Sequence, residues 1–257
     1  MPRKARERSE SGIYHIILRG ANRQEIFHDD EDKVRFLETL YRYKEKSKMK
    51  VFGWCLMGNH VHLLIGEGNE SLSVTMKRIG VSFAWFYNWK YNTTGHLFQD
   101  RYRSEKIEDD RYLLTVIRYI HQNPVKPGIV RYPSDWKWSS CGGYYGRNYY
   151  PQGLLDNEFI LEMFSDEKDN AVKRFFEYNE SSNEDKCLDD DIRIRLTDEK
   201  ARKEISKRVS GYGITEIKSL PKAQRDEILL KLKEIDGLSQ RQTARILGIS
   251  QNMVFKV

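Results

Sequence analysis

The chain has 257 residues, of which 39% are hydrophobic and 32% charged, and its formal net charge is +6. This composition argues against a disordered or membrane-embedded chain and is typical of a globular protein with one or two domains. The excess of cations favours a polyanionic partner such as a nucleic acid. Three scattered cysteines without a CxxC motif, no secretory leader and no apolar run of transmembrane length predict a cytoplasmic protein with no membrane contact.

Hydrophobic periodicity in the first half of the chain predicts alternating strands and helices. Gly58-Asn59 indicates a hairpin turn between two of the strands. In chain order, the predicted strands are 13–18, 50–57, 60–65 and 96–107, and the predicted helices begin near Asp30, Ser71 and Asp110. The resulting order, β-α-β-β-α-β and a further helix, predicts an α+β fold with a ferredoxin-like, antiparallel split βαβ sheet.

Two histidines stand two residues apart in the third predicted strand. Side chains alternate between the faces of a strand, so His60 and His62 share one face while Val61, Leu63 and Ile65 point into a core. Two imidazoles held on one face of a strand are half of a metal site. The pattern is equally compatible with two histidines on a solvent-exposed sheet face.

A phenol and an amide share one face of the helix that begins near Asp110. Tyr119 and Asn123 are four residues apart, so they lie one helical turn from each other. If this helix crosses the sheet beside the histidines, Asn123 supplies an oxygen ligand and Tyr119 a nucleophile. Tyr112 is a competing phenol on nearly the same stripe. The alternatives are a core tyrosine and an ordinary helix end before Pro124.

Three cations belong to the predicted fourth strand. Arg101, Arg103 and Lys106 roughly follow its pleat, and we expect them to contact phosphates, although a solvated edge strand explains them as well. His15, in the first strand, either faces the site or is a core histidine. These residues do not by themselves define a site.

The second half of the chain has a different, mainly helical pattern. We expect a first domain over residues 1–148, a helical extension over 149–178, an acidic linker over 179–195 and a helical region over 196–257. Within it, residues 225–257 suit a helix-turn-helix, with Ser239 as an N-cap and Gly248 as the C′ residue. Gln251 and Asn252 begin the second helix of that motif and are candidate base readers. A generic helical hairpin is the alternative.

Four segments resemble those of the IS200-like tyrosine transposases, and most of all the REP-associated branch of that family. They are Gly-Asn-His-Val-His-Leu-Leu-Ile (58–65), Phe-Gln-Asp-Arg-Tyr-Arg-Ser (98–104), Tyr-Ile-His-Gln-Asn-Pro-Val-Lys-Pro-Gly (119–128) and Trp-Lys-Trp-Ser-Ser (136–140). The motifs occur in the family's order. The last helices resemble the helix-turn-helix of bacterial regulators and of the DnaA-type replication initiator.

The resemblance implies an HUH-class nuclease and strand transferase that acts on hairpin-bearing single-stranded DNA. It implies that His60 and His62 bind the metal, and that Tyr119 forms a covalent 5′-phosphotyrosine. Asn123 stands where short IS200 enzymes carry glutamine. The donor set by itself would suit zinc, whereas the family implies Mg²⁺ or Mn²⁺, with the protein working as a monomer or homodimer. A DNA-binding regulator that uses the helix-turn-helix without catalysis is the alternative function.

Overall fold

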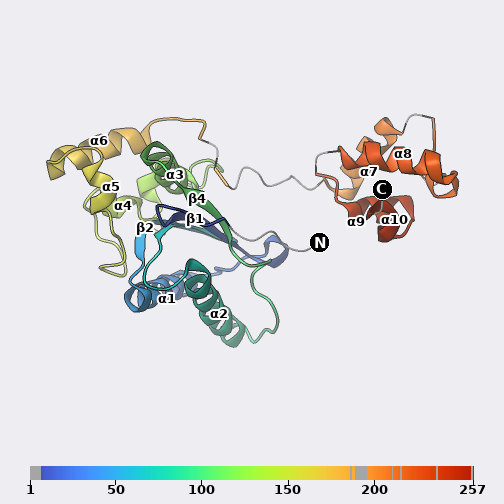
Figure 1. The fold of residues 1–257 in the computed structure, drawn as a ribbon. Helices are drawn as coiled ribbons and strands as arrows, with labels where there is room; N and C mark the ends of the chain where they lie inside the picture. The colour runs from blue at the N-terminus through green and yellow to red at the C-terminus, as the bar shows by residue number, and fades with distance from the viewer. Residues whose placement is uncertain are drawn as a thin grey trace. The chain divides into compact units, whose positions relative to one another are not determined.

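The structure is a computed structural model that describes residues 7–185, 187–188, 196–209, 211–214, 216–235, 237–255 and 257. The chain divides into two compact units, Met1–Asp190 and Asp191–Val257 (Figure 1). Among the described residues, no helix is both long enough and apolar enough to cross a bilayer.

The first unit is built on a four-stranded antiparallel sheet whose strands are ordered β2-β3-β1-β4. The strands are β1 (Ile13–Arg19), β2 (Lys50–Met57), β3 (His60–Gly66) and β4 (Arg103–Ile107). A short 3-10 helix, Ala21–Arg23, follows β1, and α1 (Asp30–Ser47) and α2 (Leu72–Lys90) provide the two crossovers. This order confirms the predicted α+β, ferredoxin-like fold.

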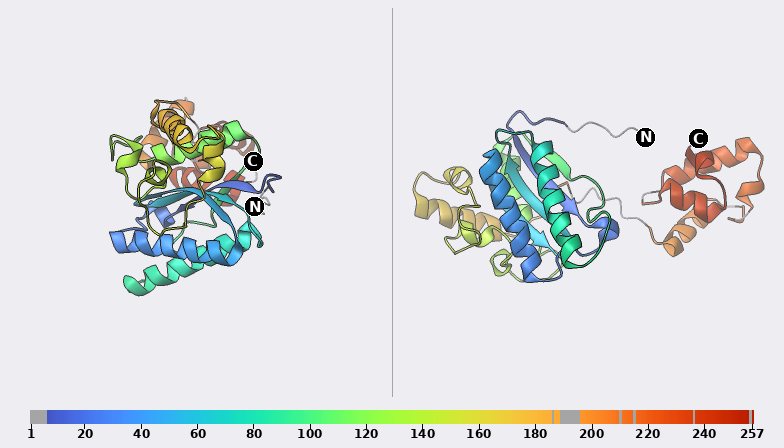
Figure 2. Two further views of the ribbon diagram at one scale, coloured as in Figure 1. Left: turned by 90° about the vertical axis from the view of Figure 1, so that its left-hand side faces the viewer. Right: turned by 90° about the horizontal axis from the view of Figure 1, so that it is seen from below.

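Helices cover both faces of the sheet. α1 and α2 lie together on one face, as the left view of Figure 2 shows, and α3 (Asp110–Gln122) packs against the other. Cross-strand partners share a face, and the register pairs Ile17 with His62, Arg19 with His60 and His15 with Glu105. The face under α3 therefore carries the histidines.

The predicted fourth strand is wrong in its first half. Residues 96–102 are irregular apart from an isolated bridge between Gly20 and Phe98, and β4 begins only at Arg103. Asp100 accepts a hydrogen bond from the backbone N–H of Arg101 at 2.7 Å, a local bond that competes with strand pairing. Arg101 thus lies outside the sheet. Arg103 and Lys106 are three residues apart in β4 and so occupy opposite faces, which corrects the expectation that the three cations follow one pleat.

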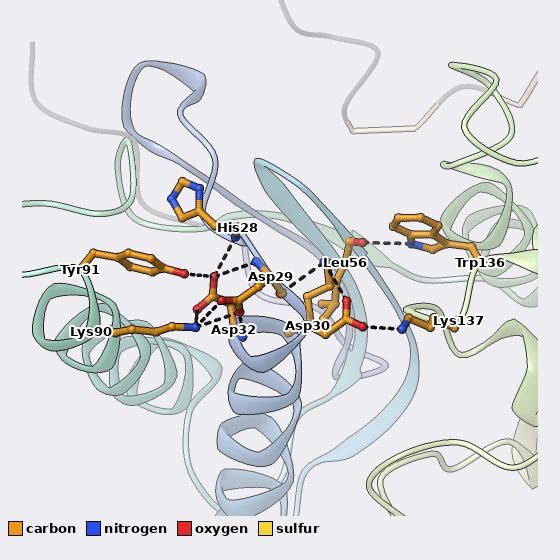
Figure 3. Close-up of polar contacts among 10 residues, drawn as sticks. His28, Asp29, Asp30, Asp32, Leu56, Lys90, Tyr91, Trp136 and Lys137 are labelled. Carbon is orange, nitrogen blue, oxygen red and sulfur yellow. Dashed lines mark hydrogen bonds and ion pairs between the residues drawn. The ribbon is translucent and has the colours of Figure 1, made fainter.

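The start of α1 is tied to the end of α2 (Figure 3). Asp29 and Asp32 form a capping box, and Lys90 Nζ lies 2.8 Å from Asp29 and 2.9 Å from the fully buried Asp32. Tyr91 donates to the same Asp32 carboxylate at 2.7 Å. Burial acts to lower the pKa of Lys90, but its hydrogen bonds to the carboxylates outweigh this and raise it. This network fixes α1 and α2 on the face away from the histidines.

The remaining helices of the first unit share its core. They are a 3-10 helix at Pro133–Asp135, α4 (Cys141–Tyr144), α5 (Glu158–Glu162) and α6 (Lys168–Glu180). Phe175 of α6 stacks on Tyr144 of α4 with the ring centroids 4.4 Å apart, and both are fully buried. The segment predicted as a helical extension is thus packed into the same hydrophobic core as the sheet.

Part of the predicted acidic linker also packs on this unit. Arg118 of α3 donates to both carboxylate oxygens of Asp185, at 2.7 and 3.0 Å, and Cys187 is only 6% exposed. Within the described part of this segment, residues 179–180 end α6, Asp185 and Cys187 pack on the first unit, and Ser181, Ser182 and Glu184 are exposed. Lys186 and residues 189–195 lie outside the described residues.

Gly53 of β2 sets how closely α3 approaches the sheet. A Cβ built at Gly53 would overlap Cδ1 of Ile117 in α3. We expect Gly53→Ala to lower the free energy of unfolding by about 1–3 kcal/mol through overpacking, measured by urea denaturation. Gly80→Ala is the matched control. Its Cβ would come no closer than 3.9 Å to a neighbour, so in α2 it should stabilise by up to about 1 kcal/mol. Equal effects of both substitutions would contradict this account.

The second unit is helical over its described residues. It comprises α7 (Asp198–Arg208), a 3-10 helix at Ile217–Ser219, α8 (Lys222–Lys233), α9 (Gln240–Leu247) and α10 (Gln251–Phe255). Ser239 caps α9 by accepting from the backbone N–H of Gln242, and Gly248 ends it with a left-handed φ of 67°. Ile205, Leu229 and Leu247 contribute to a separate core. The two predicted caps are confirmed.

Candidate functional site

The two histidines begin β3 and lie under α3. Their ring centroids are 5.0 Å apart; His60 is half-buried and His62 is fully buried. The alternative of two solvated histidines is therefore wrong for His62. A buried imidazole requires polar partners, and those partners define the site.

α3 brings the predicted phenol and amide to the same place. The Tyr119 ring lies 5.8 Å from the His62 ring, centroid to centroid. Asn123, the residue after the last turn of α3, directs Nδ2 at His62 Nε2 from 3.1 Å and Oδ1 at His60 Nε2 from 3.4 Å. The structure thus brings together all four residues singled out in the two motifs.

The proton of His60 can be assigned from its neighbours. Asn59 donates from Nδ2 to the carbonyl oxygen of Arg23 at 3.2 Å, so its Oδ1 is the atom that faces His60 Nδ1 at 2.6 Å. An amide oxygen only accepts hydrogen bonds, and Nδ1 must therefore carry the proton. We accordingly assign a lone pair to Nε2, the nitrogen that faces Asn123.

The same reasoning applies to His62. Its Nε2 accepts from the amide nitrogen of Asn123, so its proton belongs on Nδ1. That Nδ1 lies 3.1 Å from Nε2 of His15, another fully buried histidine. Sequence reasoning left the position of His15 open. The alternation of side chains along one strand does not show which residue of a neighbouring strand lies beside His15.

A divalent ion fits this donor set. The lone pairs of His60 Nε2 and Asn123 Oδ1 face each other across 3.4 Å. A cation bound between these two atoms would stabilise this arrangement. Two ligands at right angles, each about 2.2 Å from an ion, lie roughly 3.1 Å apart. Binding through His62 Nε2 as well requires the Asn123 NH₂ group to turn away. Among the described residues, no group of three or more histidine, cysteine or acidic side chains is arranged for a metal; this set has two histidines and an amide.

The two candidate phenols have different surroundings. Tyr119 is 3% exposed, and the ammonium of Lys126 lies 3.9 Å from its ring centroid. Tyr112 lies beside Glu105; burial, together with its hydrogen bond to that carboxylate, raises the pKa of Tyr112. Tyr119 is therefore the phenol next to His62 with a cation at its ring. Sequence reasoning missed Lys126, although it falls within the motif at 119–128.

The predicted DNA-contacting cations are dispersed. Arg103 is exposed on the face under α3, in the cross-strand row of Ile17 and His62. Lys106, on the opposite face, lies 3.6 Å from Glu7. Arg101 is exposed in the preceding loop.

A further cation, Arg19, which sequence reasoning did not identify, lies beside the histidines. Arg19 of β1 pairs with His60 in the register of the sheet, so both residues share the face under α3. Only this register identifies it, because its own strand carries no cationic motif.

The second unit displays its two predicted base readers. Gln251 and Asn252 are exposed in the first turn of α10, while Val254 of the same helix is 1% exposed and belongs to the core. The exposed pair therefore lies on a short helix that Val254 anchors in the core of the second unit.

Residues 9–123 match the family model described as "Transposase IS200 like". The matched segment runs from just before β1 to the residue that follows α3, and so includes His60, His62, Tyr119 and Asn123. This part of the chain is therefore similar to the IS200-like transposases.

The relatives that match the chain carry a more specific name than this family model. A Haemophilus influenzae protein (strain Rd) assigned as a REP-associated tyrosine transposase is 24% identical over 162 residues, 57% of this chain and 89% of the relative. The REP-associated tyrosine transposase of Escherichia coli K12 is 25% identical over 114 residues, 44% of this chain and 66% of that protein. A solved REP-associated tyrosine transposase bound to a REP hairpin is 21% identical, covers 59% of this chain and 89% of its own, and has a TM-score of 0.49.

Proposed function

We propose that this protein is a metal-dependent single-strand DNA endonuclease and strand transferase that cuts hairpin-bearing DNA through a covalent 5′-phosphotyrosine. The observation that carries the proposal is that His60 and His62 of β3 meet Tyr119 and Asn123 of the α3 segment at one place. A transposase function agrees with the family match. A regulator without catalysis is not favoured, because it leaves this convergence without a purpose.

The chemistry is a transesterification. The Tyr119 hydroxyl oxygen attacks the scissile phosphorus, a P–O bond to tyrosine forms, and the bond from phosphorus to the 3′ oxygen breaks. The phenol loses its proton and the leaving oxygen gains one, giving a 3′-hydroxyl. The phosphodiester count is unchanged, so another 3′-hydroxyl can reverse the reaction and join strands without a nucleotide cofactor.

The residues around Tyr119 favour this attack. The ordinary pKa of tyrosine is about 10, so its phenolate is scarce at neutral pH. The Lys126 ammonium lies 3.9 Å from the ring centroid, so a cation stands beside the attacking phenol. Burial of Tyr119 between α3 and the sheet also limits the motion of the phenol relative to the histidines.

His60, His62 and Asn123 would hold the ion through two imidazole nitrogens and one amide oxygen. When bound, Mg²⁺ or Mn²⁺ would neutralise charge on the scissile phosphate and align it for in-line attack. Three protein ligands leave positions for water and phosphate oxygens, the ligands that these hard ions prefer. The net charge of +6 suits the polyanionic substrate.

Covalent capture tests this function. The protein is incubated with single-stranded oligonucleotides taken from the DNA flanking its gene, with Mn²⁺, with Mg²⁺ or with EDTA, and run on a denaturing gel. The expected result is a protein–DNA adduct that requires the metal. Duplex binding without any adduct would overturn the proposal and favour the regulator.

We further propose that residues 225–257 bind duplex DNA through a helix-turn-helix, with Gln251 and Asn252 facing the major groove. The double substitution Gln251→Ala/Asn252→Ala should weaken binding to a selected duplex by at least about 30-fold, because each of the two lost base contacts costs about 1–3 kcal/mol. Fluorescence anisotropy measures the loss. The single-strand adduct yield should not change, and Lys233→Ala, outside α10, is the control. Unchanged duplex affinity would contradict the assignment.

A further inference from the structure

We propose that Glu105 and His15 form a relay that keeps the proton of His62 on Nδ1, so that Nε2 is held ready to bind the divalent ion. This inference rests on the proposed function, since it concerns the orientation of one of the proposed metal ligands. Glu105 and His15 act through His62, and we therefore class them as positioning residues.

The sheet register places the three side chains in line. β1 lies between β3 and β4, and His15 stands directly opposite Glu105 in the β1–β4 pair. On its other side, His15 Nε2 lies 3.1 Å from His62 Nδ1; the ring centroids are 5.4 Å apart and the ring planes are inclined by 22°. His15 Nδ1 lies 3.7 Å from Glu105 Oε2.

The order of protons follows from the two ends of this line. A carboxylate only accepts hydrogen bonds, so the His15 nitrogen nearest Glu105 is the one that carries hydrogen. His15 Nε2 is then an acceptor, and His62 must donate to it from Nδ1. At the far end, the Asn123 NH₂ group faces His62 Nε2 at 3.1 Å and requires a lone pair there. Both ends therefore demand the same tautomer of His62.

Burial shields the hydrogen-bonding groups of this relay from water. His15 and His62 have no exposed surface, so solvent cannot replace either partner. Over the described residues, His15 Nδ1 and Glu105 Oε2 are both buried atoms without a hydrogen-bond partner, and they lie 3.7 Å from each other. Buried polar atoms normally find a partner, and each of these two is placed to become the other's.

Glu105 is charged in this setting. Burial acts to raise the pKa of Glu105, but hydrogen bonding with His15 and Tyr112 outweighs it and lowers the pKa. The two proposed histidine ligands are thus oriented by different partners. Asn59 orients His60, whereas His15, with Glu105 beside it, orients His62. Metal-binding histidines commonly donate their second N–H to such a partner, which fixes the tautomer.

The metal-free wild-type protein provides the first test. Long-range ¹H–¹⁵N spectra assign the tautomer of each histidine, and we expect hydrogen on Nδ1 of both His62 and His15. Hydrogen on Nε2 of His62 would overturn the relay. This readout needs neither metal nor DNA.

Variants provide the second test, with Mn²⁺ affinity measured by electron paramagnetic resonance of the free ion. His15→Leu should weaken Mn²⁺ binding about 10- to 100-fold, the usual effect of losing such a partner. His15→Gln should restore it to within about threefold, because the glutamine oxygen can accept from His62 Nδ1–H at the place of the lost nitrogen. Equal affinities for the leucine and glutamine variants would overturn the relay.

His121→Leu is the matched control. His121 is also fully buried and bonded through both nitrogens, to Asn179 at 3.1 Å and Ser140 at 2.8 Å, but neither partner belongs to the site. It should keep wild-type Mn²⁺ affinity, and an equal loss would show general destabilisation instead of a relay. If His15→Leu does not fold, Glu105→Ala decides, since it should convert His62 to a mixture of tautomers.

The two proposals fail in distinguishable ways. Wild-type protein that binds no Mn²⁺ and forms no adduct contradicts the proposed function, whatever the tautomer of His62. A metal-dependent adduct together with unchanged Mn²⁺ affinity in His15→Leu contradicts the relay alone.

Discussion

Tyr119→Phe should abolish the covalent protein–DNA adduct, with a loss of at least about 1,000-fold, because phenylalanine has no oxygen to attack phosphorus. Single-strand affinity should stay close to that of the wild type, because the aromatic ring and its packing between α3 and the sheet remain. Denaturing gels measure the adduct, and fluorescence anisotropy measures the affinity.

Tyr112→Phe is the control for this result. It removes the competing phenol, which lies beside Glu105, and should leave most of the adduct in place. Adduct that persists in Tyr119→Phe and disappears in Tyr112→Phe would move the nucleophile to Tyr112 and contradict the proposed mechanism.

His60→Ala should weaken Mn²⁺ binding and lower the rate of adduct formation, each by about 100-fold or more, because one of three protein ligands is lost. His60 is half-buried at the start of β3, so this change should cost less folding stability than substituting the fully buried His62. Calorimetric titration with Mn²⁺ and single-turnover adduct formation are the measurements.

His96→Ala serves as the comparison, since His96 is exposed in the loop before β4. It should behave as the wild type in both assays. Wild-type Mn²⁺ affinity in His60→Ala would show that the ion, if bound, is held elsewhere.

Local sequence patterns predicted much of the fold because they depend on short-range geometry. Strand alternation placed His60 and His62 on one face, and the helical period placed Tyr119 and Asn123 on another. The helices predicted near Asp30 and Asp110 begin there, with Asp29 and Asp109 as their N-caps, and Ser239 is the N-cap that was predicted. The predicted order of strands and helices is also the order observed.

The same local patterns failed where a competing interaction decided. The apolar and aromatic residues at 96–102 suit a strand, but Asp100 bonds the neighbouring backbone instead and β4 starts late. The polar residues 179–185 suit a linker, but Asp185 finds Arg118 of α3. A single sequence does not reveal such partners, because they are distant along the chain.

The sequence by itself determined the strand that carries the histidines, the helix that carries Tyr119 and the face that each residue shares with its neighbours. Only the tertiary structure decided that α3 lies over that strand, that His15 and Glu105 line up behind His62, and that Lys126 covers the Tyr119 ring. The physical reason is that a side chain's direction follows from its own backbone, within a few residues. The register of the strands and the position of a helix on the sheet are set by the packing of the whole core. Gly53, for example, has no side chain and so leaves room for Ile117 of α3.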